Sequence, residues 1–241
     1  MSYIFLAGSG EFTSTMNRVD LKLLSLIKDP DILIIPTAAG KEKKYRHWID
    51  DGILHFKDLG FMAQGIDLTE NKDAFREDYV SILDKSNFVY FSGGDPVYLL
   101  SSLQNTPFLA KLKEKIKQDN FLLAGSSAGA MFMCELIPFN VMESLFGFNK
   151  GKLSWKKALS IVDFVVIPHF NKFSKMLNFK YLKDKFFKSF PENSLIIGID
   201  EDTGILSQDR KTFEVLGDNS VTLFKRGDED KIYLNSEKFI I

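Results

Sequence analysis

One serine in the middle of the chain has the surroundings of a nucleophile. Ser127 is the centre of Gly-Ser-Ser-Ala-Gly at positions 125–129, which follows an apolar run at 121–124 and precedes small and then apolar residues. This is the G-x-S-x-G pattern of a nucleophile elbow, a sharp strand-to-helix turn that needs tiny neighbours and exposes the serine Oγ. A Gly- and Ser-rich loop is the alternative interpretation. The apolar strand before the motif and the helical pattern after it favour the elbow.

A serine nucleophile needs a base, and histidine suits that role near neutral pH. The chain has three histidines, His47, His55 and His169. His47 and His55 fall on a helix predicted for residues 45–59, where a solvated surface histidine is the commoner outcome. His169 directly follows a buried apolar run and is the predicted base, with a structural histidine at a strand end as the alternative. Its position does not suit an α/β-hydrolase, in which the histidine comes near the chain end.

Glu201 is the predicted acid that orients His169. It follows the apolar run at 195–199, and that strand should lie beside the strand of His169. Asp200 and Asp202 are its neighbours, and alternate residues of a strand end face opposite sides. A solvated acidic turn is the alternative interpretation of this triplet.

Backbone N–H groups are predicted to bind the oxyanion of a tetrahedral intermediate. Ala128 directly follows the nucleophile, and Gly93 or Gly94 is expected to supply a second donor because a substrate carbonyl can approach a residue without a side chain. An ordinary Gly-Gly turn is the alternative. Ligands in open α/β sheets bind beyond the carboxyl ends of the strands. We therefore expect the strands of Ser127, His169 and the Gly93–Gly94 turn to be parallel neighbours.

Neither a metal nor a cofactor is predicted. The chain has one cysteine, Cys134, and lacks the H-x-x-x-H and C-x-x-C spacings that are typical of zinc sites. Gly-Ser-Gly-Glu-Phe at 8–12 begins like a dinucleotide-binding loop, but Thr13 stands where that motif needs its third glycine.

Composition limits the classes of binding partner and the cellular compartment that we expect for this protein. The 31 basic and 32 acidic residues give a net charge of −1, and without a basic stripe we expect no nucleic-acid partner. The single cysteine fits a reducing compartment. The start of the chain reads as a core strand rather than a signal peptide, and no apolar run has the length of a membrane span. These features predict a cytoplasmic protein without a membrane partner, and they do not exclude a homo-oligomer.

The pattern of apolar runs predicts an α/β fold, a doubly wound and mostly parallel sheet flanked by helices. Continuous apolar character is typical of parallel strands that are buried on both faces. Strands are predicted at 3–6, 32–35, 63–68, 87–91, 121–124, 164–167 and 195–199, and helices at 45–59, 73–83, 97–103, 108–117 and 173–187.

After residue 202 the sequence pattern changes from alternating strands and helices to short strands alone. Residues 212–216 and 220–224 flank Gly-Asp-Asn at 217–219, which predicts a β-hairpin, and short strands are expected at 231–234 and 239–241. We expect one domain over 1–241, with 204–241 as a small antiparallel hairpin region appended to it. The Phe- and Lys-rich segment 172–188 indicates an amphipathic helix with a solvated basic face, a membrane-surface helix being the alternative.

Together these motifs resemble peptidase family S51, which contains dipeptidase E and cyanophycinase on a fold related to class I glutamine amidotransferases. The resemblance implies Ser127 as nucleophile and His169 as base. The matching segments, in family order, are Ile-Pro-Thr-Ala-Ala-Gly at 35–40, Phe-Ser-Gly-Gly-Asp at 91–95, the elbow with Ala130, Pro-His-Phe at 168–170 and Gly-Ile-Asp-Glu-Asp-Thr at 198–203.

The chain departs from the family pattern at the acid. In dipeptidase E an aspartate between the serine and the histidine is a further candidate for the charge-relay acid. The corresponding stretch here offers Glu135 and Glu143 but no aspartate, which favours Glu201.

Two further departures concern the substrate. Cyanophycinases carry an arginine-rich stretch after the histidine, and residues 171–175 contain no arginine, so cyanophycin is a poor fit. The preference of dipeptidase E for an amino-terminal aspartate needs a cation in the pocket. The candidates for that cation are Lys172, Lys175 and Arg46, and the substrate-binding residues remain unassigned.

The leading hypothesis is a serine exopeptidase that hydrolyses short peptides, Asp-Xaa dipeptides among them, through Ser127, His169, Glu201 and an acyl-enzyme. The second hypothesis is a non-catalytic ligand-binding or regulatory protein on the same fold. A glutaminase-type amidotransferase is disfavoured because the elbow of that fold normally carries cysteine, whereas Cys134 lies beyond the elbow.

Overall fold

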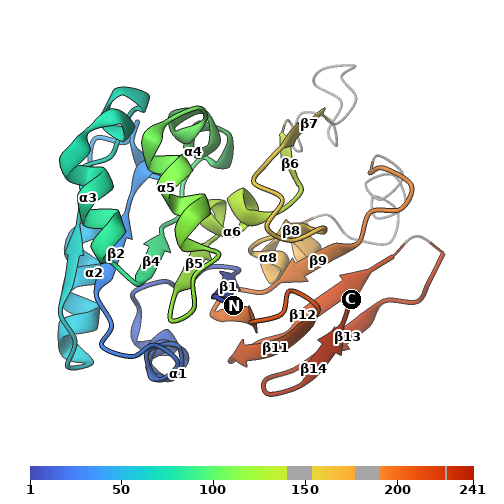
Figure 1. The fold of residues 1–241 in the computed structure, drawn as a ribbon. Helices are drawn as coiled ribbons and strands as arrows, with labels where there is room; N and C mark the ends of the chain where they lie inside the picture. Colours follow the sequence, from blue (N-terminus) through green and yellow to red (C-terminus); the bar gives the residue numbers. More distant parts are fainter. Residues whose placement is uncertain (140–153, 177–189, 226) are drawn as a thin grey trace.

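The computed structural model describes residues 1–139, 154–176, 190–225 and 227–241. Its largest element is an eight-stranded sheet of order β14-β11-β10-β1-β5-β4-β2-β3 (Figure 1). The strands from β1 to β3 in this order are parallel, and the other three are antiparallel. Their bounds are β1 Tyr3–Ala7, β2 Ile32–Ile35, β3 Ala63–Gly65, β4 Phe88–Phe91, β5 Leu122–Ser126, β10 Thr203–Ser207, β11 Thr212–Gly217 and β14 Lys238–Ile240.

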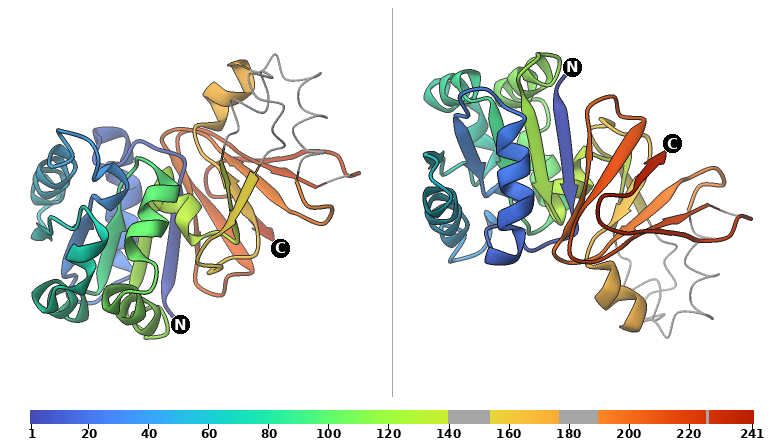
Figure 2. Two further views of the ribbon diagram at one scale, coloured as in Figure 1. Left: turned by 90° about the horizontal axis from the view of Figure 1, so that it is seen from above. Right: turned by 90° about the horizontal axis from the view of Figure 1, so that it is seen from below.

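Helices cover both faces of the parallel strands (Figure 2). Alternate residues of one strand, such as Val89 and Tyr90 of β4, belong to opposite core clusters, one packed with α3 to α6 and the other with α1 and α2. The α-helices are α1 Asn17–Ser25, α2 His47–Asp58, α3 Glu77–Lys85, α4 Pro96–Leu103, α5 Pro107–Lys115, α6 Ala128–Met133 and α8 Phe170–Met176, and the 3₁₀ helices are η1 Ser14–Met16, η2 Thr37–Ala39 and η3 Asn71–Phe75.

A second, four-stranded sheet of order β13-β12-β9-β8 lies beside the first. Strands β8 and β9 are parallel, and Val166 and Ile197 from them join the core that covers one face of the main sheet. The bounds are β8 Val165–Ile167, β9 Ile196–Ile199, β12 Val221–Phe224 and β13 Lys231–Tyr233; a separate antiparallel pair is formed by β6 Leu136–Phe139 and β7 Ser154–Lys157.

The predicted α/β class is confirmed, with differences in detail. The helix predicted at 73–83 is two elements, η3 and α3, because the backbone of Arg76 is extended (φ −68°, ψ 122°) and its guanidinium bonds Asp78 of the next turn. Helix α8 begins at Phe170 rather than at residue 173, and residues 177–187 of that prediction lie outside the described residues.

The predicted hairpin at 212–224 is wrong in its pairing. β11 pairs with β10 and β14 of the main sheet, whereas β12 pairs with β9 and β13 of the second sheet. The Gly-Asp-Asn turn docks on the bend before β10, since Asp218 N donates to Asp202 O at 3.0 Å and Asn219 N donates to Thr203 Oγ1 at 2.9 Å. The antiparallel segment 204–241 therefore extends both sheets instead of forming a separate hairpin.

Within the described parts of the chain, no helix combines the length and the apolar character that a membrane crossing requires.

Candidate active site

Ser127 stands on a strained turn between β5 and α6. Its backbone has φ 49° and ψ −106°, a conformation that non-glycine residues rarely adopt, and its N–H donates to Ala7 O at 3.0 Å. A side chain at Gly125 would overlap the backbone of Gly129, and one at Gly129 would overlap that of Phe91. The two glycines of G-x-S-x-G are thus required by close backbone packing, which fixes the serine at the carboxyl end of β5.

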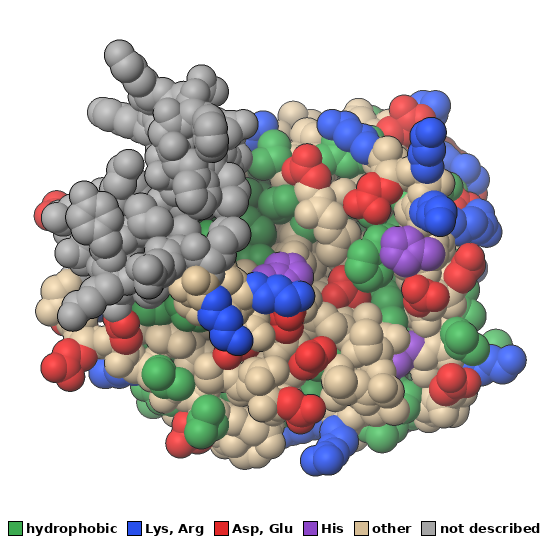
Figure 3. Space-filling model, turned by 180° about the vertical axis from the view of Figure 1, so that it is seen from behind, with side chains coloured by type: hydrophobic (Ala, Val, Ile, Leu, Met, Phe, Trp, Pro, Cys, Tyr) green, Lys and Arg blue, Asp and Glu red, His purple; other side chains and the backbone are tan. Residues whose placement is uncertain are grey.

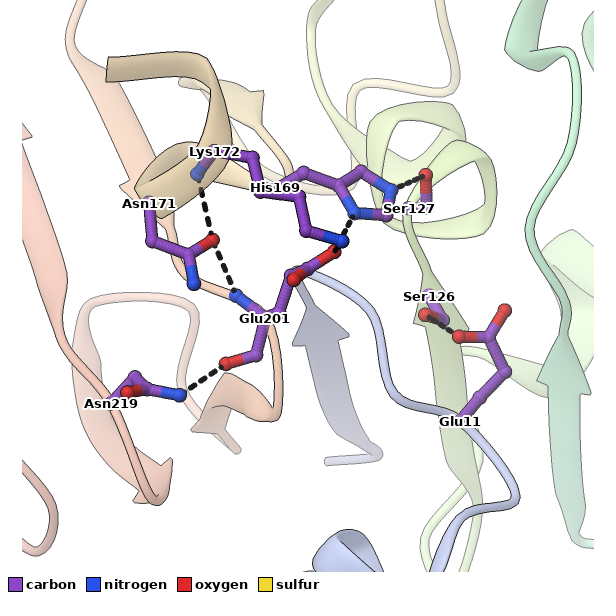
Figure 4. A network of polar contacts seen from close by, with 8 residues as sticks. All are labelled: Glu11, Ser126, Ser127, His169, Asn171, Lys172, Glu201 and Asn219. Atoms are coloured by element: carbon purple, nitrogen blue, oxygen red, sulfur yellow. Dashed lines mark hydrogen bonds and ion pairs between the residues drawn. The ribbon is translucent and has the colours of Figure 1, made fainter. Parts of the chain in front are cut away.

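Ser127, His169 and Glu201 form one hydrogen-bonded chain (Figure 4). Ser127 Oγ lies 3.1 Å from Nε2 of His169, and Nδ1 of His169 lies 2.9 Å from Oε1 of Glu201. With Nδ1–H donating to the carboxylate, Nε2 is left as the acceptor for the serine proton. The geometry is that of a nucleophile, a base and an orienting acid.

Glu201 is held ionised by two donors. Burial acts to raise the pKa of its carboxyl, but the hydrogen bonds from Lys172 and His169 outweigh burial, and the pKa lies below its usual value. Lys172 Nζ is 2.8 Å from Oε1, the oxygen that also accepts from His169. One of the candidate cations for the substrate pocket is therefore engaged by the acid.

Two asparagines fix the backbone of Glu201. Its N–H donates to Asn171 Oδ1 at 3.3 Å, and its carbonyl accepts from Asn219 Nδ2 at 2.9 Å (Figure 4). Phe170 packs where a side chain at Gly198 would stand, so helix α8 rests directly on β9. These contacts hold His169 and Glu201 in register, and the sequence does not reveal the role of either asparagine because each contacts a residue 18 or 30 positions away in the chain.

The strands that carry the site belong to two sheets. β4 and β5, which precede the Gly93–Gly94 turn and Ser127, are parallel neighbours as predicted. β8, which precedes His169, lies in the second sheet and pairs with β9, so the prediction that it neighbours β5 is wrong. His169 reaches the elbow from a left-handed backbone position (φ 51°) at the start of α8.

Gly93 already has a hydrogen-bond partner. Its N–H donates to Oε1 of Glu11 at 2.9 Å, and Oε2 of Glu11 accepts from Oγ of Ser126 at 2.6 Å. The expected role of Gly93 as an oxyanion donor is therefore contradicted in this conformation. The N–H of Ala128 opens helix α6, where no intrahelical acceptor exists, and Gly94 lines the pocket beside it.

A cavity of about 440 Å³ opens in front of Ser127. The loop after β1 and the first turns of α2 form its walls, and they contribute Glu11, Phe12, Trp48 and Asp51. The sequence of the loop after β1 resembles the start of a dinucleotide-binding motif, whereas in the structure the loop forms a wall of the cavity. Its position after the first parallel strand, at the same rim as Ser127, was the signal for a substrate wall.

The other histidines take different positions. His47 is exposed and lines the cavity, as expected for a surface histidine. His55 is only 7% exposed and its Nε2 lies 2.7 Å from Oδ2 of the buried Asp20, so the surface prediction for His55 is wrong. A side chain on the core-facing stripe of α2 explains the difference.

The remaining candidates lie away from the catalytic chain. Arg46 is paired with Asp67 at 2.8 Å and Lys175 is exposed on α8, and neither lines the cavity. Glu135 is exposed at the end of α6, and Glu143 lies outside the described residues. Burial raises the pKa of the Cys134 thiol to about 12, which suits a structural cysteine.

Among the described residues no group of histidine, cysteine, aspartate and glutamate side chains could hold a metal ion.

Comparison with known proteins decides the family. The sequence model of peptidase family S51 matches residues 4–215. The chain belongs to peptidase family S51. A crystal structure of a peptidase from an acI-B1 actinobacterium superposes with a TM-score of 0.84 at 30% identity, covering 100% of this chain and 97% of that one. The protein is therefore a serine-type peptidase of this family.

More distant S51 relatives agree with this assignment. An uncharacterized peptidase of Pasteurella multocida is 27% identical over 216 residues, which cover 88% of this chain and all of that protein. A cyanophycinase of Synechococcus elongatus is 29% identical over 202 residues, and the match spans 81% of this chain but only 58% of the cyanophycinase. A putative peptidase E from Listeria monocytogenes shares the fold at a TM-score of 0.62 and 21% identity.

Proposed function

We propose that this S51 peptidase is a serine exopeptidase that hydrolyses short peptides through Ser127, His169 and Glu201. The observation that carries the proposal is the continuous chain of hydrogen bonds from Ser127 Oγ through the imidazole to the Glu201 carboxylate. A cavity of this size, closed on one side by the loop after β1, fits a few residues of substrate better than a long polymer.

The proposed reaction follows from this geometry. Ser127 Oγ attacks the scissile carbonyl carbon while Nε2 of His169 takes the hydroxyl proton, and Glu201 stabilises the resulting imidazolium. The N–H groups of Ala128 and Gly94 bind the oxyanion. The tetrahedral intermediate collapses as Nε2 gives its proton to the leaving amine, which leaves an acyl group on Ser127. Water then attacks the ester, with the same residues in reversed roles.

Asp-Xaa dipeptides are the substrates that the family resemblance implies, and they belong in the first activity screen. The walls of the cavity give them no direct support, because the described residues that line it include Glu11 and Asp51 and neither lysine nor arginine.

The test of the proposed function is the Ser127→Ala variant in a screen of dipeptides that vary in the first residue. We expect kcat/KM to fall by at least about 10³-fold with the fold intact, as for loss of a triad nucleophile. Ser126→Ala removes the neighbouring hydroxyl and should lose much less. The opposite ranking of the two variants would identify Ser126 as the nucleophile and refute the nucleophile-elbow interpretation.

A further inference from the structure

Glu11 is a buried carboxylate at the wall of the cavity that the proposed reaction does not use. The residue is 7% exposed, and its two oxygens accept hydrogen bonds from Gly93 N–H and Ser126 Oγ. Both donors are neutral. Within the described residues Glu11 forms no ion pair with a lysine or an arginine. No cationic side chain among the described residues therefore balances the Glu11 carboxylate at the cavity wall.

Glu11 and the nucleophile flank the same position beside Gly93. A methyl group added to Gly93 would lie 3.0 Å from Oε1 of Glu11, 3.6 Å from Cβ of Ser127 and 4.0 Å from Cη2 of Trp48. The carboxylate, the nucleophile and an aromatic wall therefore converge on one small volume. Figure 4 shows Glu11 reaching toward the elbow from the loop after β1, on the side of Ser127 away from Glu201.

The amino end of a short peptide matches this position. In a peptide the nitrogen and the carbonyl carbon of one residue are about 2.5 Å apart, since both are bonded to the same Cα. When Ser127 attacks the first peptide bond, the α-ammonium group must lie within a few ångströms of Oγ. The Glu11 carboxylate lines the same cavity as Ser127 and is within reach of that group, and charge-assisted hydrogen bonds of this kind are short and strong.

We propose that Glu11 binds the protonated α-amino group of the first residue of the substrate, and that the cavity selects peptides with a free amino terminus and a neutral or basic first side chain. This inference rests on the proposed exopeptidase function and assigns its substrate class.

The other charges around the cavity point the same way. Asp51 adds a second acid to the wall, while Lys172 is held by Glu201 and Arg46 by Asp67. On the face shown in Figure 3, acidic (red) and hydrophobic (green) side chains lie between the histidines (purple). An acidic first side chain would place another negative charge beside Glu11 without a cation to balance it, which disfavours binding.

The test compares matched peptides on the full-length wild-type protein and the Glu11→Gln variant. The peptides are Leu-Leu and N-acetyl-Leu-Leu, and Asp-Leu and Asn-Leu. In the wild type we expect kcat/KM to be about 10- to 100-fold higher for the free amine than for the acetylated peptide, the range of a hydrogen bond to a charged group. We expect Asp-Leu to be cleaved at least about tenfold more slowly than Asn-Leu.

The specificity ratio separates binding of the amine from a structural role of Glu11. Glu11→Gln keeps the shape but loses the charge, so the ratio of free to acetylated peptide should fall to within about threefold of unity, whatever the loss in absolute rate. Glu114→Gln, a surface substitution away from the cavity, should keep the wild-type ratio. An equal fall for both peptides, with the ratio preserved, would overturn the proposal, as would a wild type that cleaves both equally well.

Binding measurements keep this result independent of turnover. Calorimetry on Ser127→Ala should show the free amine binding at least about tenfold more tightly than the acetylated peptide, and adding Glu11→Gln should remove the difference. If N-acetyl-Lys-Leu binds as tightly as Leu-Leu, the carboxylate reads a side-chain charge and the assignment to the α-amino group is wrong. Failure of the proposed function would show itself differently, as hydrolysis that survives Ser127→Ala.

Discussion

The two halves of the catalytic chain are held in different ways. The nucleophile belongs to the main parallel sheet, where Gly125 and Gly129 allow backbone segments to touch and Ser127 is forced into a strained turn. The base and the acid follow β8 and β9 of the second sheet and are held by side chains: the His169 and Glu201 side chains are 43% and 19% exposed, and Lys172 is 73% exposed. Backbone packing therefore positions the serine, whereas a partly solvated hydrogen-bond network positions and tunes the base.

Among substitutions that separate the roles of the two halves, the largest loss of activity is expected at the acid. Glu201→Gln should keep the fold and lower kcat by about 10³-fold, because an amide can hold the wrong imidazole tautomer and cannot stabilise the imidazolium. Steady-state kinetics with a cleaved dipeptide measures the loss. Glu135→Gln, at an exposed position after α6, is the matched control. A crippled Glu135→Gln beside an active Glu201→Gln would place the acid in the segment between the serine and the histidine.

In the half that carries the nucleophile, we expect substitutions to lower stability and activity by disturbing backbone packing. Gly125→Ala inserts a methyl group into the backbone of Gly129, which we expect to cost about 2 kcal/mol of unfolding free energy and to displace Ser127 enough to lower kcat/KM by about 10²-fold. Urea denaturation and peptide kinetics measure the two losses. Gly60→Ala is the control for strain without overlap: Gly60 has a positive φ of 89°, no atom lies within 4 Å of its added methyl group, and the substitution should leave kcat/KM unchanged. Wild-type activity in Gly125→Ala would refute packing as the device that positions the serine.

How far the sequence predicts this molecule depends on the range of the interactions. The sequence predicts Ser127 from the G-x-S-x-G motif, and it predicts His169 and Glu201 because each follows a strand, where an α/β sheet carries its chemistry. Other features join segments far apart in the chain. They are the second sheet, the turn at residues 217–219 that leads from the main sheet into the second, and the hydrogen bonds of Glu11 with Gly93 and Ser126. Local periodicity carries no information about which of two sheets a strand joins, so these features needed the structure.

The smallest effect is expected at Lys172. Its hydrogen bond helps to keep the pKa of Glu201 below the usual value, so in the wild type the carboxylate stays ionised as the pH falls through that usual value. Lys172→Met removes this donor and moves protonation of Glu201 to higher pH. Activity at neutral pH should change by less than about threefold, while the Glu201 carboxyl becomes protonated at a higher pH than in the wild type. The carboxyl ¹³C chemical shift of Glu201, followed by NMR as the pH is lowered, measures this change, and an unchanged titration midpoint would show that Lys172 does not tune the acid.

Covalent labelling tests the central claim, that Ser127 is a nucleophile activated by His169 and Glu201. A small fluorophosphonate reacts with activated serine hydroxyls, and mass spectrometry locates the adduct. We predict one adduct on Ser127, no adduct in Ser127→Ala, and labelling that is at least about 10²-fold slower in His169→Ala, because the hydroxyl then has no base. An adduct on Ser126, or labelling of Ser127 at the same rate without His169, would contradict the account.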